Sequence, residues 1–293
     1  MSTGHKSGFV AIIGKPNAGK STLLNALMGK KLVIATPKAQ TTRHRILGIL
    51  NGENHQVIFS DTPGLIRPKY ELQRKMVGSI KLALEDADLF LMVADVNESF
   101  PEEDILELAS KQGVPKILAL NKCDVAEPDL INFRKRELTE EVEFDRVIEI
   151  SALRKRNLDE LLEAILELLP EGPEWYPKDS LSDRPERFFV AEIVREKLFL
   201  YLDQELPYST EVEVVDFEED EDIVRISADI HVERRNHKGM IIGKQGKMIK
   251  KLGTQARREI EAFLNKKVHI ELYVRVSEGW KDDSRKLRGF GYD

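Results

Sequence analysis

Apolar positions in the first 170 residues follow two alternating patterns. Short, nearly continuous apolar runs predict buried strands, and longer stretches with an apolar residue every three or four positions predict helices. The strand-like runs are Gly8–Gly14, His55–Asp61, Asp88–Asp95, Val114–Asn121 and Arg146–Ser151. The helical stretches are Ser21–Met28, Leu72–Glu85, Glu102–Gln112, Pro128–Glu143 and Leu158–Leu169. Strands that alternate with helices form βαβ units, so we expect an α/β domain with a mainly parallel sheet.

The pattern changes at Pro170. Four prolines and a glycine interrupt residues 170–185, which favours a linker in which Trp175 and Tyr176 pack against one domain. An amphipathic helix, two strands, a glycine-interrupted helical segment and a final strand follow, and together predict a smaller α+β domain. These elements are Glu186–Gln204, Thr210–Phe217, Asp222–Val232, Asn236–Leu264 and Val268–Val276.

The predicted division is therefore a first domain at 1–170, a linker at 171–185, a second domain at 186–280 and a tail at 281–293. We expect Trp280 to be a packing residue. Phe290 and Tyr292 are predicted to lie in an exposed, frayed terminus, since chain ends are commonly poorly ordered.

Composition and charge narrow the class of protein. The 45 basic and 51 acidic side chains give a net charge of −6, which excludes a uniformly basic surface for nucleic acid. Charge is nevertheless segregated, because Arg234–Arg258 holds nine bases and no acid, whereas Glu211–Asp222 holds eight acids and no base. The single cysteine, Cys123, cannot form an intramolecular disulfide, which fits a reducing compartment.

The longest nearly apolar run, Ala87–Val96, contains two aspartates and is far shorter than the ~20 residues that a membrane-spanning helix needs. We therefore expect a cytoplasmic protein. Peripheral association with the inner face of the cell membrane stays open at this point.

A phosphate-binding motif follows the first predicted strand. It matches the pattern G-x-x-x-x-G-K-[ST] and precedes a predicted helix, as this motif requires. Glycines let backbone N–H groups turn toward phosphate oxygens, and the helix N-terminus adds partial positive charge. Lys20 is predicted to neutralise the β- and γ-phosphates, and the Ser21 hydroxyl to bind Mg²⁺. The predicted loop comprises Gly14, Lys15, Pro16, Asn17, Ala18, Gly19, Lys20, Ser21 and Thr22.

A second motif, Asp61-Thr62-Pro63-Gly64, follows another predicted strand. An acid at a strand end can hold Mg²⁺ through water, and the backbone N–H groups after it can sense a γ-phosphate. Between the two motifs lie Thr41 and Thr42, of which we favour Thr42 as the threonine that closes over Mg²⁺. We therefore assign the metal to Ser21, Thr42 and Asp61, and the catalytic step to Lys20, Thr42, Asp61 and Gly64.

Two further motifs predict the base. Asn121-Lys122-Cys123-Asp124 ends a strand, and the Asp124 carboxylate can accept N1–H and the exocyclic amine of guanine, a donor pair that adenine lacks. Asn121 can add contacts to the base edge and the loop, and the Lys122 stem can cover the ring. Ser151-Ala152-Leu153, after the last strand, can offer a backbone N–H to guanine O6. The sequence therefore predicts a site for a guanine nucleotide.

The basic segment of the second domain contains a GxxG loop between two helical stretches. Glycines permit close approach of a phosphate backbone, lysines attract it, and an adjoining apolar groove can accept unstacked bases, as in KH domains that bind single-stranded RNA. The predicted RNA-binding residues are Arg234, Arg235, Lys238, Ile241, Ile242, Gly243, Lys244, Gln245, Gly246, Lys247, Lys250 and Arg257.

Together the motifs resemble those of the translation-factor-related GTPases. The set GKPNAGKS, AQTTRH, DTPG, NKCD and SAL is most similar to the Era family, and the α-β-β-α-α-β half resembles a type II KH domain. This resemblance implies a doubly wound P-loop G domain before the KH domain, and hydrolysis of GTP to GDP and phosphate with Mg²⁺. The implied partners are the 3′ end of 16S ribosomal RNA and the 30S subunit during its assembly. We expect a monomer and no DNA partner.

Two positions bear on the predicted rate of hydrolysis. Leu65 follows the second motif where Ras-like GTPases carry a glutamine that orients water, and leucine cannot polarise water, so the resemblance implies slow intrinsic turnover. Asn17 stands where related enzymes use asparagine to hold K⁺, which implies stimulation by potassium.

Three alternatives stay open from the sequence. A P-loop ATPase or kinase is disfavoured by the NKCD motif. An RNA-binding protein with an inactive G domain is disfavoured by the complete phosphate, metal and base motifs. A GTPase acting in transfer-RNA modification or at the membrane would need an additional domain or a stronger amphipathic anchor.

Overall fold

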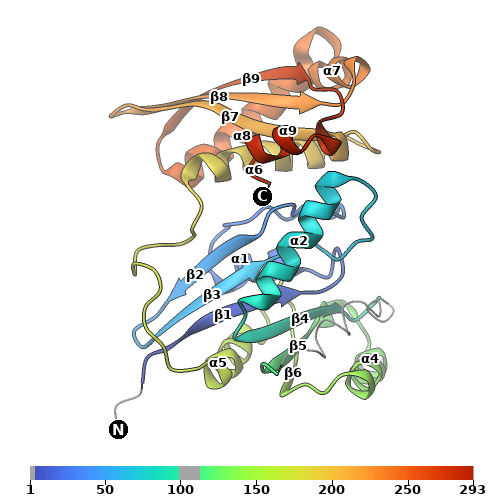
Figure 1. The fold of residues 1–293 in the computed structure, drawn as a ribbon, viewed down its shortest axis with the longest axis vertical. Coiled ribbons are helices and arrows are strands. Elements are labelled where there is room, and N and C mark those ends of the chain that lie inside the picture. The colour runs from blue at the N-terminus through green and yellow to red at the C-terminus, as the bar shows by residue number, and fades with distance from the viewer. Residues whose placement is uncertain (1–3, 99–112, 293) are drawn as a thin grey trace. The chain divides into compact units, whose positions relative to one another are not determined.

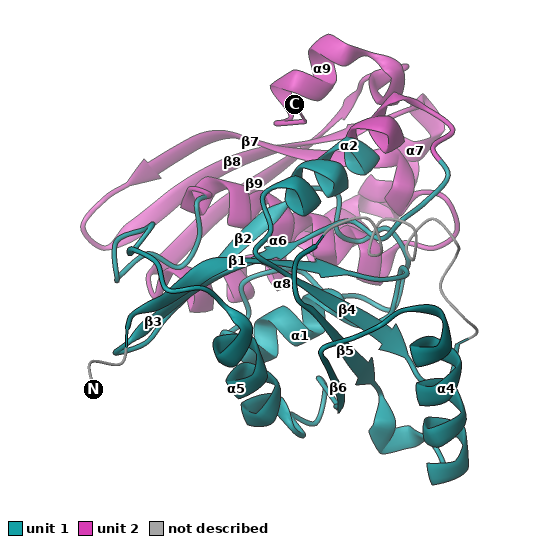
Figure 2. Cartoon of the chain, turned by 60° about the horizontal axis from the view of Figure 1, so that its bottom comes forward, with its two compact units in different colours: residues 1–67, 76–183 teal, residues 68–75, 184–293 magenta. Residues whose placement is uncertain are grey.

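The computed structural model describes residues 4–98 and 113–292, and the helix predicted at Glu102–Gln112 lies outside them. The chain folds as two compact units (Figure 2), one of residues 1–67 and 76–183 and the other of residues 68–75 and 184–293. Each unit contains its own sheet. No helix of the described ranges is long and apolar enough to cross a membrane.

The first unit is built on a six-stranded sheet of order β2-β3-β1-β4-β5-β6. Only β2 is antiparallel to its neighbour, so the predicted mainly parallel sheet is confirmed. The strands are β1 (Lys6–Ile13), β2 (Ile46–Asn51), β3 (His55–Asp61), β4 (Leu89–Asp95), β5 (Lys116–Asn121) and β6 (Arg146–Glu149).

Strand β2 was not predicted from the sequence. Its six residues, ILGILN, are interrupted by Gly48, which weakens the apolar pattern. The structure gives that glycine a reason, because a Cβ there would lie 2.8 Å from Cδ1 of Leu24. The glycine therefore lets the helix after β1 pack closely on the sheet.

Helices cover both faces of this sheet, as the doubly wound fold requires. The four described helices are α1 (Lys20–Leu27), α2 (Glu71–Glu85), α4 (Pro128–Glu141) and α5 (Leu158–Leu168). Helix α2, in front of the sheet in Figure 1, contributes Ile80 and Leu84 to the same core cluster as Leu138 of α4. Helices α1 and α5 contact each other on the other face. The predicted fold class is thereby confirmed for this unit.

The predicted linker packs along the outer edge of the six-stranded sheet. The N–H of Ile49 donates to the carbonyl of Leu181 at 2.9 Å, and so pairs the free edge of β2. The backbone N–H groups of Trp175 and Tyr176 donate to the side chain of Gln56 at 2.7 and 3.0 Å. The prediction that Trp175 and Tyr176 pack against a domain is therefore confirmed.

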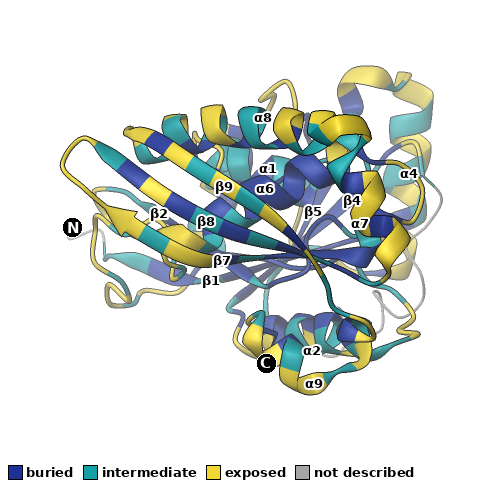
Figure 3. Cartoon of the chain, turned by 90° about the horizontal axis from the view of Figure 1, so that it is seen from above, coloured by how far each residue is buried: buried dark blue, intermediate teal, exposed yellow. Residues whose placement is uncertain are grey.

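The second unit has a three-stranded sheet of order β7-β8-β9, in which β8 is antiparallel to β7 and parallel to β9. Buried positions alternate with more exposed ones along β8 (Figure 3), and the buried residues of the sheet form one core with three helices. The predicted order α-β-β-α-α-β is confirmed. Its elements are α6 (Glu186–Tyr201), β7 (Thr210–Glu219), β8 (Ile223–Val232), α7 (Arg235–Ile242), α8 (Lys247–Leu264) and β9 (Lys267–Val276).

Helix α6 was predicted to be amphipathic, and this is wrong, because charged residues on it are also buried. Arg195 is fully buried and donates to both carboxylate oxygens of Glu192 at 2.7 and 2.6 Å. Burial by itself lowers the pKa of Arg195, but the carboxylates of Glu192 and Glu211 outweigh it and raise the pKa above its usual value. The sequence pattern cannot distinguish a solvated ion pair from one that a core encloses.

The expectation of a frayed C-terminus is also wrong. Residues Ser284–Gly289 form helix α9, whose N-cap Asp283 accepts two backbone N–H bonds. Trp280 is buried, as predicted, and its ring packs edge-on against Phe290. The Tyr292 hydroxyl donates to Oε2 of Glu211 at 2.5 Å. A polar pairing with a distant strand, invisible in the local sequence, thus anchors the chain end.

Candidate functional site

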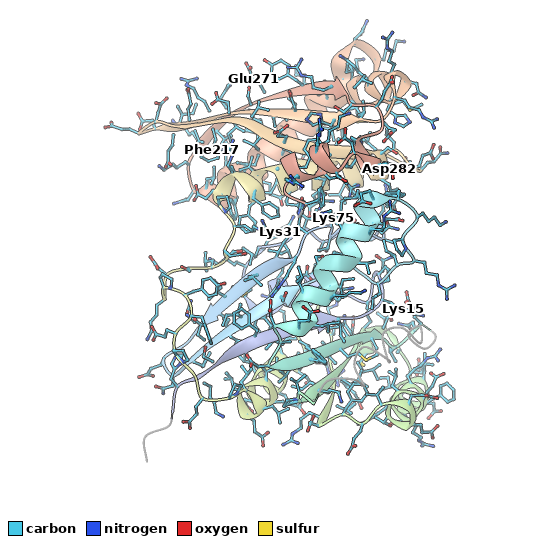
Figure 4. All side chains as sticks on the ribbon, viewed as in Figure 1. Lys15, Lys31, Lys75, Phe217, Glu271 and Asp282 are labelled. Carbon is cyan, nitrogen blue, oxygen red and sulfur yellow. The ribbon has the colours of Figure 1, made fainter. Side chains whose placement is uncertain are left out.

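The phosphate loop connects the end of β1 to the start of α1, and Lys15, which Figure 4 labels, belongs to this loop. Gly14 and Gly19 have φ angles of 151° and 99°. A Cβ on Gly14 would lie 2.2 Å from the carbonyl oxygen of Val93, so only glycine fits there. Nζ of the buried Lys20 donates to the carbonyl oxygens of Gly14 and Lys15 at 3.0 and 2.8 Å. The ammonium is thus held inside the loop that would surround a phosphate.

Three oxygen-bearing side chains meet beside this loop. Ser21 Oγ donates to Asp61 Oδ2 at 2.7 Å and lies 2.9 Å from Thr42 Oγ1. Thr41 instead bonds to the hydroxyl of Thr36 at 2.6 Å and to the carbonyl of Lys38 at 2.7 Å. The geometry therefore favours Thr42 over Thr41 as the threonine that reaches the metal position.

The chemistry of this cluster fits Mg²⁺, which prefers hard oxygen ligands. Among the described residues, Oδ1 of Asp61 is buried and has no hydrogen-bond partner. Burial raises the pKa of Asp61 to about 6, although the bond from Ser21 and the charge of Lys20 act in the opposite direction. Burial likewise lowers the pKa of Lys20 to about 8, against the charge of Asp61. A divalent cation beside Asp61 and a phosphate beside Lys20 would favour the charged forms of both side chains.

Asn121 joins three loops at the base side. Its Nδ2 donates to the carbonyl of Ala18 at 2.8 Å, and its Oδ1 accepts the N–H groups of Lys122 and Ala152 at 2.8 and 3.0 Å. Asp124 lies next to this network, with Arg154 Nε 3.8 Å from Oδ2 of the carboxylate. The phosphate loop, NKCD and SAL are therefore brought together although they are far apart in sequence.

The cleft at the phosphate loop also includes residues that the sequence did not indicate. They belong to the segment between α1 and the AQTTRH motif and are Ile34, Ala35, Thr36 and Lys38, and Gln40 of that motif lines the cleft as well. Pro16, Asn17, Thr22 and Gly64 line the same cleft, in agreement with their predicted proximity. The Leu65 side chain packs against the core cluster of the unit, and it has no polar atom with which to orient a water molecule.

In the second unit, the GxxG loop joins α7 to α8. Gly243, Gln245 and Gly246 all have positive φ angles, of 71°, 54° and 73°. A Cβ on Gly243 would meet Cβ of Met248 at 2.7 Å, whereas nothing of the protein lies within 4 Å of a Cβ on Gly246. The loop therefore exposes backbone at Gly246. The predicted RNA-binding residues with exposed polar side chains are Arg234, Arg235, Lys238, Lys244, Gln245, Lys247, Lys250 and Arg257.

A groove between α8 and β9 adjoins this loop. Its wall residues include Lys250 and Arg257, which were predicted to bind RNA, and others that were missed. The missed positions on α8 lie four and five residues after Ile249, on one helix face, and those on β9 are two residues apart, so the periodicity of each element was the available signal. They are Ile249, Gly253, Thr254, Ile270 and Leu272.

One predicted RNA contact is corrected by the structure. Ile241 is 0% exposed and belongs to the core cluster of the second unit. Ile242 is partly buried against the same cluster. The apolar pair before the GxxG loop faces inward because α7 needs it to pack on the sheet, and Ile241 therefore offers no surface to a ligand.

Comparison with known proteins identifies the class. Residues 9–122 match the family model described as 50S ribosome-binding GTPase, and residues 205–281 match the one described as KH domain. The protein is thus a GTPase-type G domain followed by a KH domain. It is 46% identical over 290 residues to GTPase Era of Geotalea daltonii, with 98% of each chain covered. It is 43% identical over 293 residues to GTPase Era of a Thermoanaerobacter species, covering 99% of this chain and 97% of the relative. The chain belongs to the Era family of GTPases.

Solved structures agree over nearly the whole chain. A crystal structure of Era in complex with MgGDPNP and nucleotides 1506–1542 of 16S ribosomal RNA matches with a TM-score of 0.94 and 40% identity, covering 98% of this chain and 99% of that one. An Aquifex aeolicus Era variant bound to GDP and AlF₄⁻ matches with a TM-score of 0.93 and 39% identity, again covering 98% and 99%. The predicted family is therefore confirmed.

Proposed function

We propose that this chain binds and hydrolyses GTP with Mg²⁺, binds the 3′ end of 16S ribosomal RNA, and acts in 30S subunit assembly. The observation that carries the nucleotide part is the bonding of Asn121 to Ala18 and Ala152, which unites the phosphate and base loops. The related Era that is solved with MgGDPNP and nucleotides 1506–1542 of 16S ribosomal RNA supports the proposed binding of GTP and the proposed binding of ribosomal RNA.

The proposed roles follow from the positions of the side chains. Ser21 and Thr42 would hold Mg²⁺ directly and Asp61 through water; the ion neutralises charge on the β- and γ-phosphates when bound. Lys20 neutralises the same phosphates, and Gly64 lets the loop after β3 approach Pro16, whose N would be 2.8 Å from an added Cβ. Leu65 does not orient water, so we expect slow turnover without a stimulating partner.

Guanine selection is tested by competition against a fluorescent GDP analogue. We expect GTP to displace it and a hundredfold excess of ATP to leave it bound, because adenine lacks the N1–H and 2-amine donor pair that Asp124 would accept. The Asp124→Asn variant should lose GTP affinity and gain affinity for xanthosine triphosphate, and Glu141→Gln on the surface of α4 is the matched control. Equal displacement by ATP and GTP would exclude the proposed base site.

RNA binding is tested with a single-stranded RNA of the 16S 3′-end sequence. If about four phosphates are contacted, the slope of log affinity against log salt should be roughly −3. The variant with Gly243→Asp and Gly246→Asp should abolish RNA binding and retain GTP binding, with Gly78→Asp on α2 as the control. Unchanged RNA affinity in the double variant would refute the assignment of the GxxG loop.

Potassium stimulation is part of the same proposal. Asn17 is exposed at the phosphate loop with a φ angle of 65°, so its side chain is accessible to a bound nucleotide and cation. GTP hydrolysis should be faster in KCl than in NaCl, and Asn17→Ala should remove the difference. Identical rates in both salts for the unmodified protein would exclude a potassium site.

We further propose that the protein is a cytoplasmic monomer that acts on the 30S subunit, with peripheral membrane association as a secondary state. The exposed basic loop supports contact with a polyanion. Sedimentation of cell extracts should place the protein with 30S particles, and washing the membrane fraction with salt should release any remainder. A protein found exclusively with membranes after that wash would refute this localisation.

A further inference from the structure

Asp95 lies at the edge of the nucleotide site but has no role in the scheme above. It is the last residue of β4, and in the parallel pairing with β5 it stands opposite Asn121. Its side chain is only 6% exposed, and its Oδ2 forms an ion pair with Nζ of Lys122 at 2.6 Å. A nearly buried carboxylate therefore holds the ammonium of a residue in the base motif.

The arrangement fixes Lys122 at both ends. Its backbone N–H donates to Oδ1 of Asn121 at 2.8 Å, and its φ angle of 65° places it in the left-handed region. The carboxylate of Asp95 is itself oriented, since Oδ1 accepts the backbone N–H of Asn97 at 3.0 Å. The four-carbon stem of Lys122 thus spans from the end of β5 to the end of β4, and its rotamers are restricted before any ligand binds.

We propose that Asp95 is a positioning residue for guanine-nucleotide binding. It holds the Lys122 ammonium so that the aliphatic stem forms a fixed surface under the base. This inference rests on the proposed GTP site. A flexible lysine would lose rotamer entropy on binding, whereas a lysine already held by Asp95 does not, and the affinity gain is therefore one of preorganisation.

The chemistry of this contact predicts a particular signature. GDP and GTP share the base, so loss of the Asp95 charge weakens both to the same extent. The reacting phosphate lies at the opposite end of the nucleotide, so the rate at saturating GTP stays unchanged. An ion pair that only stabilised the fold would add little to the free energy of unfolding, since the Lys122 side chain is 37% exposed. Its loss would not change nucleotide affinity while leaving the turnover rate unchanged.

The test is a double-mutant cycle on the full chain. Asp95→Asn keeps the size and the acceptor for Asn97 but removes the charge, and Lys122→Met keeps an unbranched stem without the ammonium. We expect Asp95→Asn to raise the Kd of a fluorescent GDP analogue and of GTP by about fivefold, with kcat within about twofold of the unmodified protein. In the Lys122→Met background, Asp95→Asn should change neither Kd. Glu167→Gln, which breaks the surface pair with Arg146, is the matched control.

Each result decides between the two roles. An Asp95→Asn effect that persists in the Lys122→Met background, or that appears in kcat alone, would overturn the inference, as would unchanged affinity for both nucleotides. Thermal unfolding of each variant, together with Asp95→Glu, which restores the charge and should recover part of the affinity, separates a positioning role from loss of folding. Failure of the unmodified protein to bind GTP at all would instead refute the proposed function.

Discussion

Gln56 offers a sharp test of how the linker is held on the first unit. The side chain is 0% exposed and lies in β3, where a polar residue is unexpected. Nε2 donates to Oδ1 of Asn51 at 2.7 Å and to the carbonyl of Tyr176 at 2.8 Å. Oε1 accepts the backbone N–H groups of Trp175 and Tyr176 at 2.7 and 3.0 Å. One side chain therefore satisfies three backbone groups of the linker.

The Gln56→Leu substitution removes all four hydrogen bonds at nearly constant volume, so the cost is polar and not a cavity. A buried hydrogen bond contributes about 1 kcal/mol net, and a buried group left without its partner costs more. With the linker in place, four lost bonds and the buried groups left without partners would cost more than about 4 kcal/mol. We expect the linker to detach instead, which exposes these groups to water and limits the loss to about 2–4 kcal/mol.

Two measurements report on detachment. Native-state hydrogen exchange should show faster exchange of the Trp175 and Tyr176 amides, and limited trypsin digestion should cleave after Lys178 earlier than in the unmodified protein. Asn51→Ala is the graded control, since it removes one bond to Gln56 and one to Ser180. Unchanged protection of both amides in Gln56→Leu would refute the idea that this side chain holds the linker.

Three further predictions follow from individual contacts. Burial and the charge of Glu149 raise the pKa of Cys123 to about 11. Because the thiolate is the reactive form, alkylation of Cys123 at pH 8 should be about 100-fold slower in the folded protein than after unfolding. Equal alkylation rates would contradict this prediction. Tyr292→Phe removes the bond to Glu211 and should destabilise the second unit by about 1.5–3 kcal/mol, measured by Trp280 fluorescence in a Trp175→Phe background; a change below about 0.5 kcal/mol would count against the anchor. In Gly19→Ala, the new Cβ would lie 2.3 Å from Nδ2 of Asn121, so GDP affinity should fall more than about tenfold, whereas Gly78→Ala on α2 should leave it unchanged.

The sequence by itself determined those features of the protein that are encoded within a few neighbouring residues. The glycines and lysine of the phosphate loop, the Asp61 motif, NKCD and the GxxG loop each need a fixed local backbone, so their spacing is diagnostic. Mainly apolar runs likewise marked five of the six strands, because strands buried on both faces are rich in apolar residues. The class of protein followed from the order of these local signals.

Other features depend on partners distant in the chain, and only the tertiary structure decided them. Strand β2 is a strand because β3 and Leu181 pair with its edges, and Gln56 is buried because the linker satisfies its amide. Ile241 became a core residue when α7 packed on its sheet, and Tyr292 is fixed because Glu211 accepts its hydroxyl. Burial and long-range hydrogen bonding are properties of the assembled fold, so a local pattern of apolar and polar residues does not contain them.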